Sequence, residues 1–260
     1  MDAQLARDLA LCLRGNAYLR GTMPRPNDIE RTHPAFQRVR EIKFQQMPRG
    51  AYQWQMVAES VGAWLDVAKW AGASRITFRI PDGARGMSGA DSSYGILAVE
   101  NTADTEWWQA NSRLVAKPGG KDERVWSVTY RVIGKNMQIP VTLRPQIATV
   151  SDAQTRLCDA LEEMNRFGLT SVRERCQSGL AQLESQTPQS GYEAELEALG
   201  AGLEVQQLLA AAVAAWSFGG EEDNSDATNM SIEPGDFALN RLFSAIIEAF
   251  EAAVEVAVRS

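Results

Sequence analysis

The hydrophobic period of the sequence changes at Arg75-Ile76-Thr77-Phe78-Arg79-Ile80, where apolar side chains alternate strictly with polar ones. Alternation at every second residue is typical of a β-strand with one buried face. Upstream of this stretch, apolar residues recur at three- and four-residue steps, which is the period of an amphipathic helix. The stretch therefore predicts the start of a β-sheet that follows a helical region.

Four further strands are expected on its carboxyl-terminal side, at residues 94–99, 108–116, 126–132 and 137–144. Turn residues separate these strands, and no helical pattern lies between them. Because parallel strands need a long crossover connection, strands this close together are expected to pair antiparallel. The sequence predicts a central antiparallel sheet of about five strands.

Helices are expected on both sides of the sheet. On the amino-terminal side the apolar spacing predicts helices over residues 2–14, 34–46 and 53–71, with Pro34 at a first helical position. From residue 150 onward the pattern is helical again, with an interruption expected at residues 200–202. This order predicts the α+β class: N-terminal helices, the antiparallel sheet, and a C-terminal helical bundle. We expect an α+β domain over residues 1–148 and a helical domain, or a helical layer packed on it, over residues 149–260.

The last expected helix, Asp236–Arg259, carries an apolar stripe at close to heptad spacing. A stripe of this kind predicts packing against other helices of the chain or against a second subunit. The stripe residues that we expect in helix packing or at an interface are Leu239, Phe243, Ile246, Phe250 and Val254.

The composition is that of a folded protein, with 45% hydrophobic and 23% charged residues among 260. Charged residues interrupt the Leu-rich amino terminus, so no secretory signal peptide is expected. The longest apolar run, Leu208–Trp216, is too short to span a bilayer. The three cysteines show no disulfide framework. These features predict a cytoplasmic protein without a membrane segment, and the preference for Arg over Lys suggests a GC-rich bacterial genome.

Charge is distributed unevenly along the chain. Residues 1–150 hold 20 Lys and Arg against 14 Asp and Glu, whereas residues 151–260 hold 6 against 19. A basic half can bind an anionic partner, and it can equally attract the acidic half of its own chain. The residues that we consider for anion or nucleic-acid binding are Arg31, Arg38, Arg40, Lys43, Arg49 and Arg85.

Two local sequence patterns suggest that these six residues bind anions or nucleic acid. The first five lie close to Tyr52 and Trp54, and arginine with aromatic neighbours can bind nucleic acid through phosphate contacts and base stacking. Nearby Glu30 and Glu41, with an overall pI near 5.0, favour instead a solvated surface or internal salt bridges. Arg85 lies in a glycine-rich loop, residues 81–93, that could cradle a phosphate but lacks the Gly-Lys-Ser/Thr ending of a P-loop.

The sequence contains no recognisable catalytic motif. His33 is the only histidine, and neither an HExxH motif nor a Cys/His cluster is present, so no metal and no cofactor are expected. The leading interpretation is a non-catalytic interaction or structural protein of the bacterial cytoplasm, with a protein partner or a second copy of itself. The alternatives are nucleic-acid or anionic-ligand binding through the basic half, which is less favoured, and an enzyme without a local motif.

Overall fold

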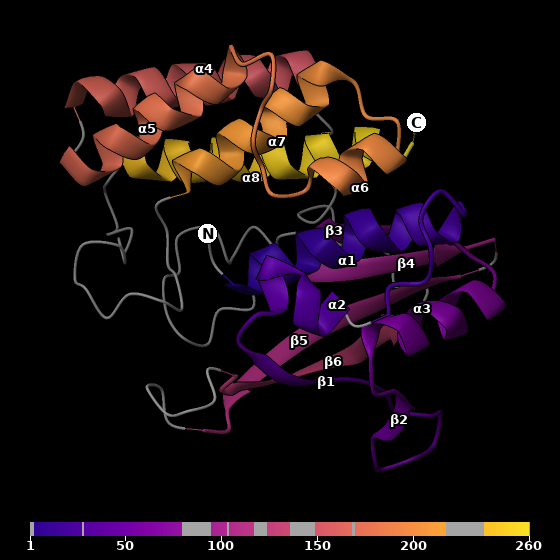
Figure 1. The fold of residues 1–260 in the computed structure, drawn as a ribbon. Helices are drawn as coiled ribbons and strands as arrows, with labels where there is room; N and C mark the ends of the chain where they lie inside the picture. The colour runs from indigo at the N-terminus through magenta and orange to yellow at the C-terminus, as the bar shows by residue number, and fades with distance from the viewer. Residues whose placement is uncertain are drawn as a thin grey trace. The chain divides into compact units, whose positions relative to one another are not determined.

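The computed structural model describes residues 3–27, 29–79, 95–102, 104–116, 124–135, 149–167, 170–216 and 237–259. The chain divides into two compact units (Figure 1). A sheet unit consists of Ala6–Phe78 and Gly95–Gln138, and a helical unit consists of Met1–Leu5, Arg79–Tyr94 and Ile139–Ser260. The expected domain boundary between residues 148 and 149 stays a prediction.

The sheet unit contains a six-stranded mixed sheet with the strand order β2-β1-β6-β5-β4-β3. Its strands are β1 (Val39–Gln46), β2 (Gln55–Ala58), β3 (Ala73–Arg79), β4 (Ile96–Asn101), β5 (Thr105–Leu114) and β6 (Trp126–Lys135). The pairs β1–β2, β4–β5 and β5–β6 are antiparallel, whereas β1 and β6 are parallel. The parallel pair joins the first strand of the chain to the last described one.

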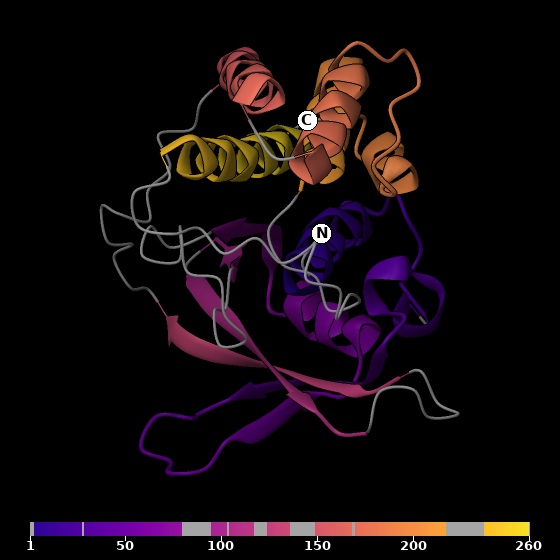
Figure 2. The same cartoon turned by 90° about the vertical axis from the view of Figure 1, so that its left-hand side faces the viewer.

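Two helices, α1 (Ala3–Leu19) and α3 (Val61–Trp70), cover one face of this sheet (Figure 2). Trp64 of α3 stacks on Phe44 of β1 with ring centroids 4.5 Å apart. Asp8 of α1 accepts a hydrogen bond from the hydroxyl of Tyr130 in β6 at 2.8 Å, and both residues are fully buried. The core of the sheet unit therefore lies between these helices and the inner face of β1 and β6.

The α+β class is confirmed, with helices before and after a central sheet. The sheet differs in detail from the expectation, because over the described residues it has six strands and includes a parallel pair, β1 with β6. The expected antiparallel pairing is confirmed for β4 with β5 and for β5 with β6.

The prediction of a helix over residues 34–46 is wrong. The chain forms a short 3-10 helix at Pro34–Phe36 and then strand β1. The three-residue spacing of Phe36, Val39 and Ile42 fits a helix, but Glu41 to Gln45 also alternates polar and apolar residues. Pairing of β1 with both β2 and β6 stabilises the extended conformation, which local spacing alone does not reveal.

The prediction of a helix over residues 53–71 is confirmed only in its second half. Residues 55–58 form β2, and the helix begins only at Val61. Ser60 caps this helix, since its hydroxyl accepts a hydrogen bond from the backbone N–H of Ala63 at 3.2 Å. The helix expected over residues 2–14 is confirmed and extends to Leu19. The expected strand at residues 137–144 and the glycine-rich loop at residues 81–93 lie outside the described residues.

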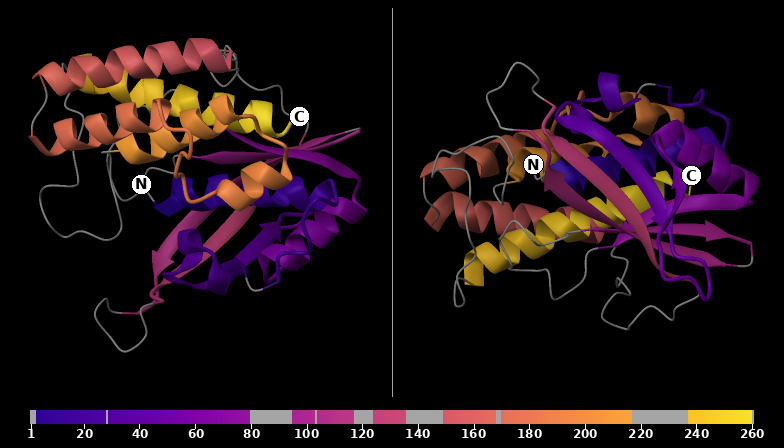
Figure 3. Two further views of the ribbon diagram at one scale, coloured as in Figure 1. Left: turned by 45° about the horizontal axis from the view of Figure 1, so that its top comes forward. Right: turned by 90° about the horizontal axis from the view of Figure 1, so that it is seen from below.

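In the helical unit, four helices pack as a closed ring of neighbours, α4–α5–α7–α8 (Figure 3). The helices of this unit are α4 (Val150–Phe167), α5 (Thr170–Leu183), α6 (Glu193–Ala198), α7 (Leu203–Ala215) and α8 (Phe237–Ala257). The expected interruption at residues 200–202 is confirmed, with Gly200 in the left-handed region at a φ of 72°. Among the described residues, no helix combines the length and apolar character needed to cross a bilayer.

Candidate functional site

The outer face of the sheet, opposite α1 and α3, is polar across its three central strands. The polar sheet face consists of Glu41, Lys43 and Gln45 in β1, Ser127, Thr129 and Arg131 in β6, and Gln109, Asn111 and Arg113 in β5. These residues alternate with the core residues Ile42, Phe44, Val128 and Tyr130. In these three strands one side of the sheet faces the core, and the other carries hydrogen-bonding and charged groups, among which Ser127 is buried.

Strand register arranges the polar sheet face in three rows. Glu41, Ser127 and Arg113 form one row and Lys43, Thr129 and Asn111 form the next. In the third row Gln45 lies between Arg131 of β6 and Met56 of β2. Side chains opposite one another on neighbouring strands are close enough to interact. The register therefore places Lys43, Arg113 and Arg131 on the same face of the sheet, each in a different row.

Glu41 is the carboxylate at the centre of the charged groups. Its Oε2 lies 2.7 Å from Nζ of Lys43, and its Oε1 accepts a hydrogen bond from the Ser127 hydroxyl at 2.6 Å. Nη2 of Arg113 lies 4.0 Å from the same Oε1. The hydrogen bond from Lys43, followed by that from Ser127, holds the pKa of Glu41 below its ordinary value. With three cations and one carboxylate, the face keeps a net positive charge.

Arg131 links the polar sheet face to an aromatic side chain. Its guanidinium carbon lies 5.0 Å from the centroid of the Trp54 ring, and its Nε donates to Oε1 of Gln45 at 3.2 Å. A guanidinium over an indole face is attracted by the negative potential of the ring. The contact holds Trp54, which immediately precedes β2, beside the polar sheet face.

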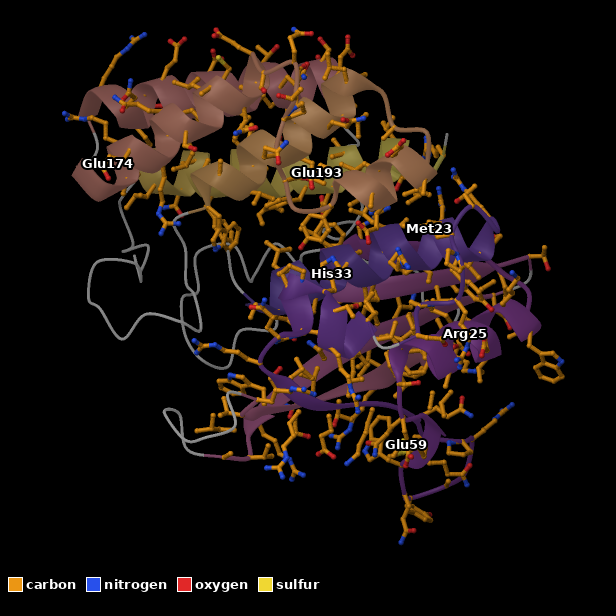
Figure 4. The ribbon with its side chains drawn as sticks, viewed as in Figure 1. Met23, Arg25, His33, Glu59, Glu174 and Glu193 are labelled. Atoms are coloured by element: carbon orange, nitrogen blue, oxygen red, sulfur yellow. The ribbon has the colours of Figure 1, made fainter. Side chains whose placement is uncertain are left out.

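The hairpin that joins β1 to β2 is unusually rich in exposed apolar side chains. The apolar hairpin, residues 47–56, carries Met47 at 44%, Tyr52 at 98%, Trp54 at 37% and Met56 at 44% exposure. The strand order places β2 at the edge of the sheet, next to β1. Glu59, labelled in Figure 4, is exposed just beyond the end of β2. The apolar hairpin and the polar sheet face are continuous through Trp54 and Met56.

The predicted anion-binding residues are only partly brought together. Lys43 lies on the polar sheet face. Arg40 is exposed and lies at the bulge between Val39 and Glu41, where the register gives it no opposite residue in β6. Arg49 is exposed in the apolar hairpin, and Arg31 is exposed in the short helix α2 (Ile29–Thr32). The remaining two are Arg38, which is half-buried just before β1, and Arg85, which lies outside the described residues.

Sequence reasoning missed Arg113 and Arg131 as members of the surface. Both stand at outward positions of strands that the alternation had predicted. Their proximity to Lys43 depends on the register of β6 against β1 and β5, which is a long-range property of the sheet. The available signal was the alternation of Arg131 with Tyr130 and Val132.

The stripe residues predicted for helix packing are all buried in α8: Leu239, Phe243, Ile246, Phe250 and Val254. Trp216 contacts two of them, with ring centroids 5.9 Å from Phe243 and 6.0 Å from Phe250. Helix α8 packs against α4 and α7 of its own chain. The contacts of Phe243 and Phe250 with Trp216 are thus made within the chain, and the assignment of the whole stripe to helix packing or to an interface stays a prediction.

The single histidine and one buried cysteine have the following surroundings. His33, labelled in Figure 4, uses its Nδ1 to accept a hydrogen bond from the backbone N–H of Ala35 at 3.1 Å. Burial raises the pKa of the Cys176 thiol to about 11, so this cysteine is protonated at neutral pH. Within the described ranges, no cluster of three or more His, Cys, Asp or Glu residues could hold a metal ion.

No protein-family model matches this chain, and no match to it was found among the curated proteins or the solved structures.

Proposed function

We propose that this chain is a non-catalytic interaction protein of the bacterial cytoplasm that binds a protein partner through the apolar hairpin and the adjoining polar sheet face. The observation that carries the proposal is the gathering of four exposed large apolar side chains within the ten residues of one hairpin. Exposed apolar side chains scattered singly are ordinary, whereas contiguous ones mark binding surfaces.

The residue types on this surface support a protein partner. Tyr, Trp, Met and Arg are enriched in protein–protein interfaces, and Trp, Tyr and Arg dominate their binding energy. Tyr52, Trp54 and Met56 supply the apolar area, while Arg49 and Arg131 supply guanidinium groups. An interface centred on Trp54 would combine an aromatic anchor with a charged rim.

Site-specific photo-crosslinking tests this proposal in the cell of origin. A benzophenone amino acid replaces Tyr52, whose side chain is almost fully exposed, and in a matched control it replaces Asp152 on the exposed surface of α4. We expect a discrete crosslinked species of defined mass from position 52 and none from position 152. A product of twice the chain mass would identify a second copy as the partner. Equal or absent crosslinking at the two positions would contradict the proposal.

A second candidate function is the binding of an anionic ligand or nucleic acid. It is favoured by one observation, the presence of Lys43, Arg113 and Arg131 on one sheet face, with Arg131 over the Trp54 ring. Phosphate contacts make such binding strongly dependent on salt. Titration of the protein with a labelled oligo(dT) at low and high salt tests this candidate, and absence of binding at low salt would remove it.

A further inference from the structure

The apolar hairpin contains two exposed methionines, one on each arm. Met47 and Met56 are each 44% exposed. Met56 pairs with Gln45 in the strand register, so its side chain lies on the polar sheet face. Met47 directly follows β1, and Trp54 directly precedes β2. The hairpin thus carries a thioether at each end of the segment that contains Tyr52 and Trp54.

The other methionines that the structure describes are less accessible to a dissolved oxidant. Met164 in α4 is only 4% exposed. Met23 is half-buried, and its sulfur accepts a hydrogen bond from Nη1 of Arg14 at 3.0 Å. Among the described methionines, exposure is therefore highest in the surface that we propose for partner binding.

The described cysteines are poor competitors for an oxidant, because a peroxide reacts with the thiolate form of cysteine. Cys12 and Cys176 are buried, and burial raises the pKa of Cys176 to about 11. Burial, followed by the charge of Glu162, also raises the pKa of the half-buried Cys158. Within the described ranges, the most exposed sulfur therefore belongs to the two methionines of the apolar hairpin.

We propose that oxidation of Met47 and Met56 to methionine sulfoxide is a reversible switch that releases the partner from the apolar hairpin. The oxidant is hydrogen peroxide. One of its oxygens is transferred to the thioether sulfur, the O–O bond breaks, and the other oxygen leaves as water, so the sulfur is oxidised and the peroxide is reduced. Methionine sulfoxide reductases reverse the step with two thiols, which become a disulfide while the sulfoxide oxygen leaves as water. This inference rests on the proposed function and adds its regulation.

Oxidation changes the surface because a sulfoxide is polar. A thioether is apolar and adapts its shape, and methionine is enriched in protein interfaces. A sulfoxide oxygen that a partner covers without a hydrogen bond is buried at a cost in free energy. Because Met47 and Met56 lie on either side of Trp54 in the sequence, both ends of the apolar surface become polar. We expect binding to fall by at least about tenfold.

Peptide mass mapping tests where the oxidant reacts. The purified full-length protein is treated with hydrogen peroxide for increasing times, and catalase stops the reaction. We expect Met47 and Met56 to gain one oxygen each well before Met164 and Met23 do. Oxidation of Met164 as fast as that of Met56 would overturn the proposal. The oxidised protein should keep the thermal midpoint of the untreated protein, and a lowered midpoint would overturn the proposal by showing that peroxide acts through unfolding.

The effect on binding is measured by crosslinking from position 52. The protein is oxidised first, freed of peroxide, and then added to a desalted lysate of the cell of origin, which lacks the thiols that the reductases need. The matched variant is Met47→Leu/Met56→Leu, whose side chains are apolar, similar in volume and inert to peroxide. Peroxide should reduce the crosslinked product of the wild type by at least about tenfold and that of the double variant by less than about twofold. An equal loss in both proteins would place the sensitive group elsewhere and overturn the proposal.

Reduction of the oxidised wild type provides a second readout that does not depend on the double variant. Treatment with dithiothreitol and two methionine sulfoxide reductases, one for each sulfoxide epimer, should restore the crosslink. Absence of recovery would overturn the reversible switch. If untreated and oxidised protein crosslink the partner equally, the switch fails and the proposed function stands. Absence of a crosslink from the untreated protein would contradict the proposed function and the switch together.

Discussion

The guanidinium carbon of Arg131 lies 5.0 Å from the centroid of the Trp54 ring, and the two residues come from different segments of the sheet unit, Gly95–Gln138 and Ala6–Phe78. Nε of Arg131 is held at the same time by the side chain of Gln45. The indole is thus oriented at the sheet edge by contacts within the chain. A side chain held in place before a partner arrives loses less conformational entropy on binding.

Replacing Arg131 by Leu should weaken binding of the partner and leave the stability of the protein nearly unchanged. A cation–π contact at an exposed site contributes about 0.5–1 kcal/mol, so the free energy of unfolding should fall by no more than about that amount. Urea denaturation measures this change, and crosslinking from position 52 measures binding. We expect a clear loss of crosslinking with near-normal stability. A variant as unstable as a core mutant would show instead that Arg131 is a structural residue.

Phe44→Ala should strongly destabilise the sheet unit. The ring is fully buried and stacks between Trp64 at 4.5 Å and Tyr130 at 5.2 Å. Truncation of a buried Phe to Ala typically destabilises a protein by about 3–5 kcal/mol, through lost burial and the cavity that remains. Thermal unfolding followed by circular dichroism should show a lower midpoint. Tyr52→Ala, the exposed control, should change stability by less than about 0.5 kcal/mol.

Phe250→Ala tests whether α8 is an internal packing element. Phe250 is fully buried and lies 6.0 Å from Trp216, so the variant should lose about 3–5 kcal/mol of stability. Light scattering should give the same mass as the wild type. Unchanged melting with a halved mass would move the helix to a subunit interface. Unchanged melting and mass together would show that α8 is dispensable for folding.

Glu41 should make part of the stability depend on pH. Its pKa is lowered in the folded state, chiefly by the hydrogen bond from Lys43 and then by that from Ser127. A carboxyl group with a lowered folded-state pKa stabilises the protein above its unfolded-state pKa. That contribution is lost as the pH falls through the folded-state value.

Urea denaturation of the wild type and of Glu41→Gln, at neutral pH and in acid, measures this contribution. The wild type should be the more stable of the two at neutral pH, and the difference should shrink in acid. Glu59→Gln, at an exposed position just beyond β2, is the matched charge control and should not alter the acid dependence in this way. A difference between wild type and Glu41→Gln that persists unchanged in acid would contradict the assigned pKa direction.

The sequence was sufficient for the fold class because strong local periods mark most elements. The alternation at residues 75–80 and the heptad-like stripe of α8 each indicate one type of secondary structure. At Phe36, Val39 and Ile42 the spacing fits a helix as well as a strand. There, pairing of β1 with β6, more than 80 residues away, stabilises the strand conformation.

The candidate surface was harder to predict than the fold. Lys43 was predicted within a basic cluster, but the same sequence segment also contains Arg38, which is half-buried outside the polar sheet face. Arg113 and Arg131 join Lys43 only through strand register, and register depends on all three strands at once. The position of Trp54 likewise depends on the edge strand β2 that follows it, whereas the sequence predicted a helix over residues 53–71.

Crosslinking from position 52 in a Trp54→Ala background tests the central claim most directly. The same crosslinker in a Trp70→Ala background is the matched control, since both tryptophans have exposed side chains in the sheet unit. We predict that Trp54→Ala abolishes or greatly reduces the crosslinked partner and that Trp70→Ala leaves its yield unchanged. The same yield in both backgrounds would contradict the claim that the apolar hairpin binds a protein partner through Trp54.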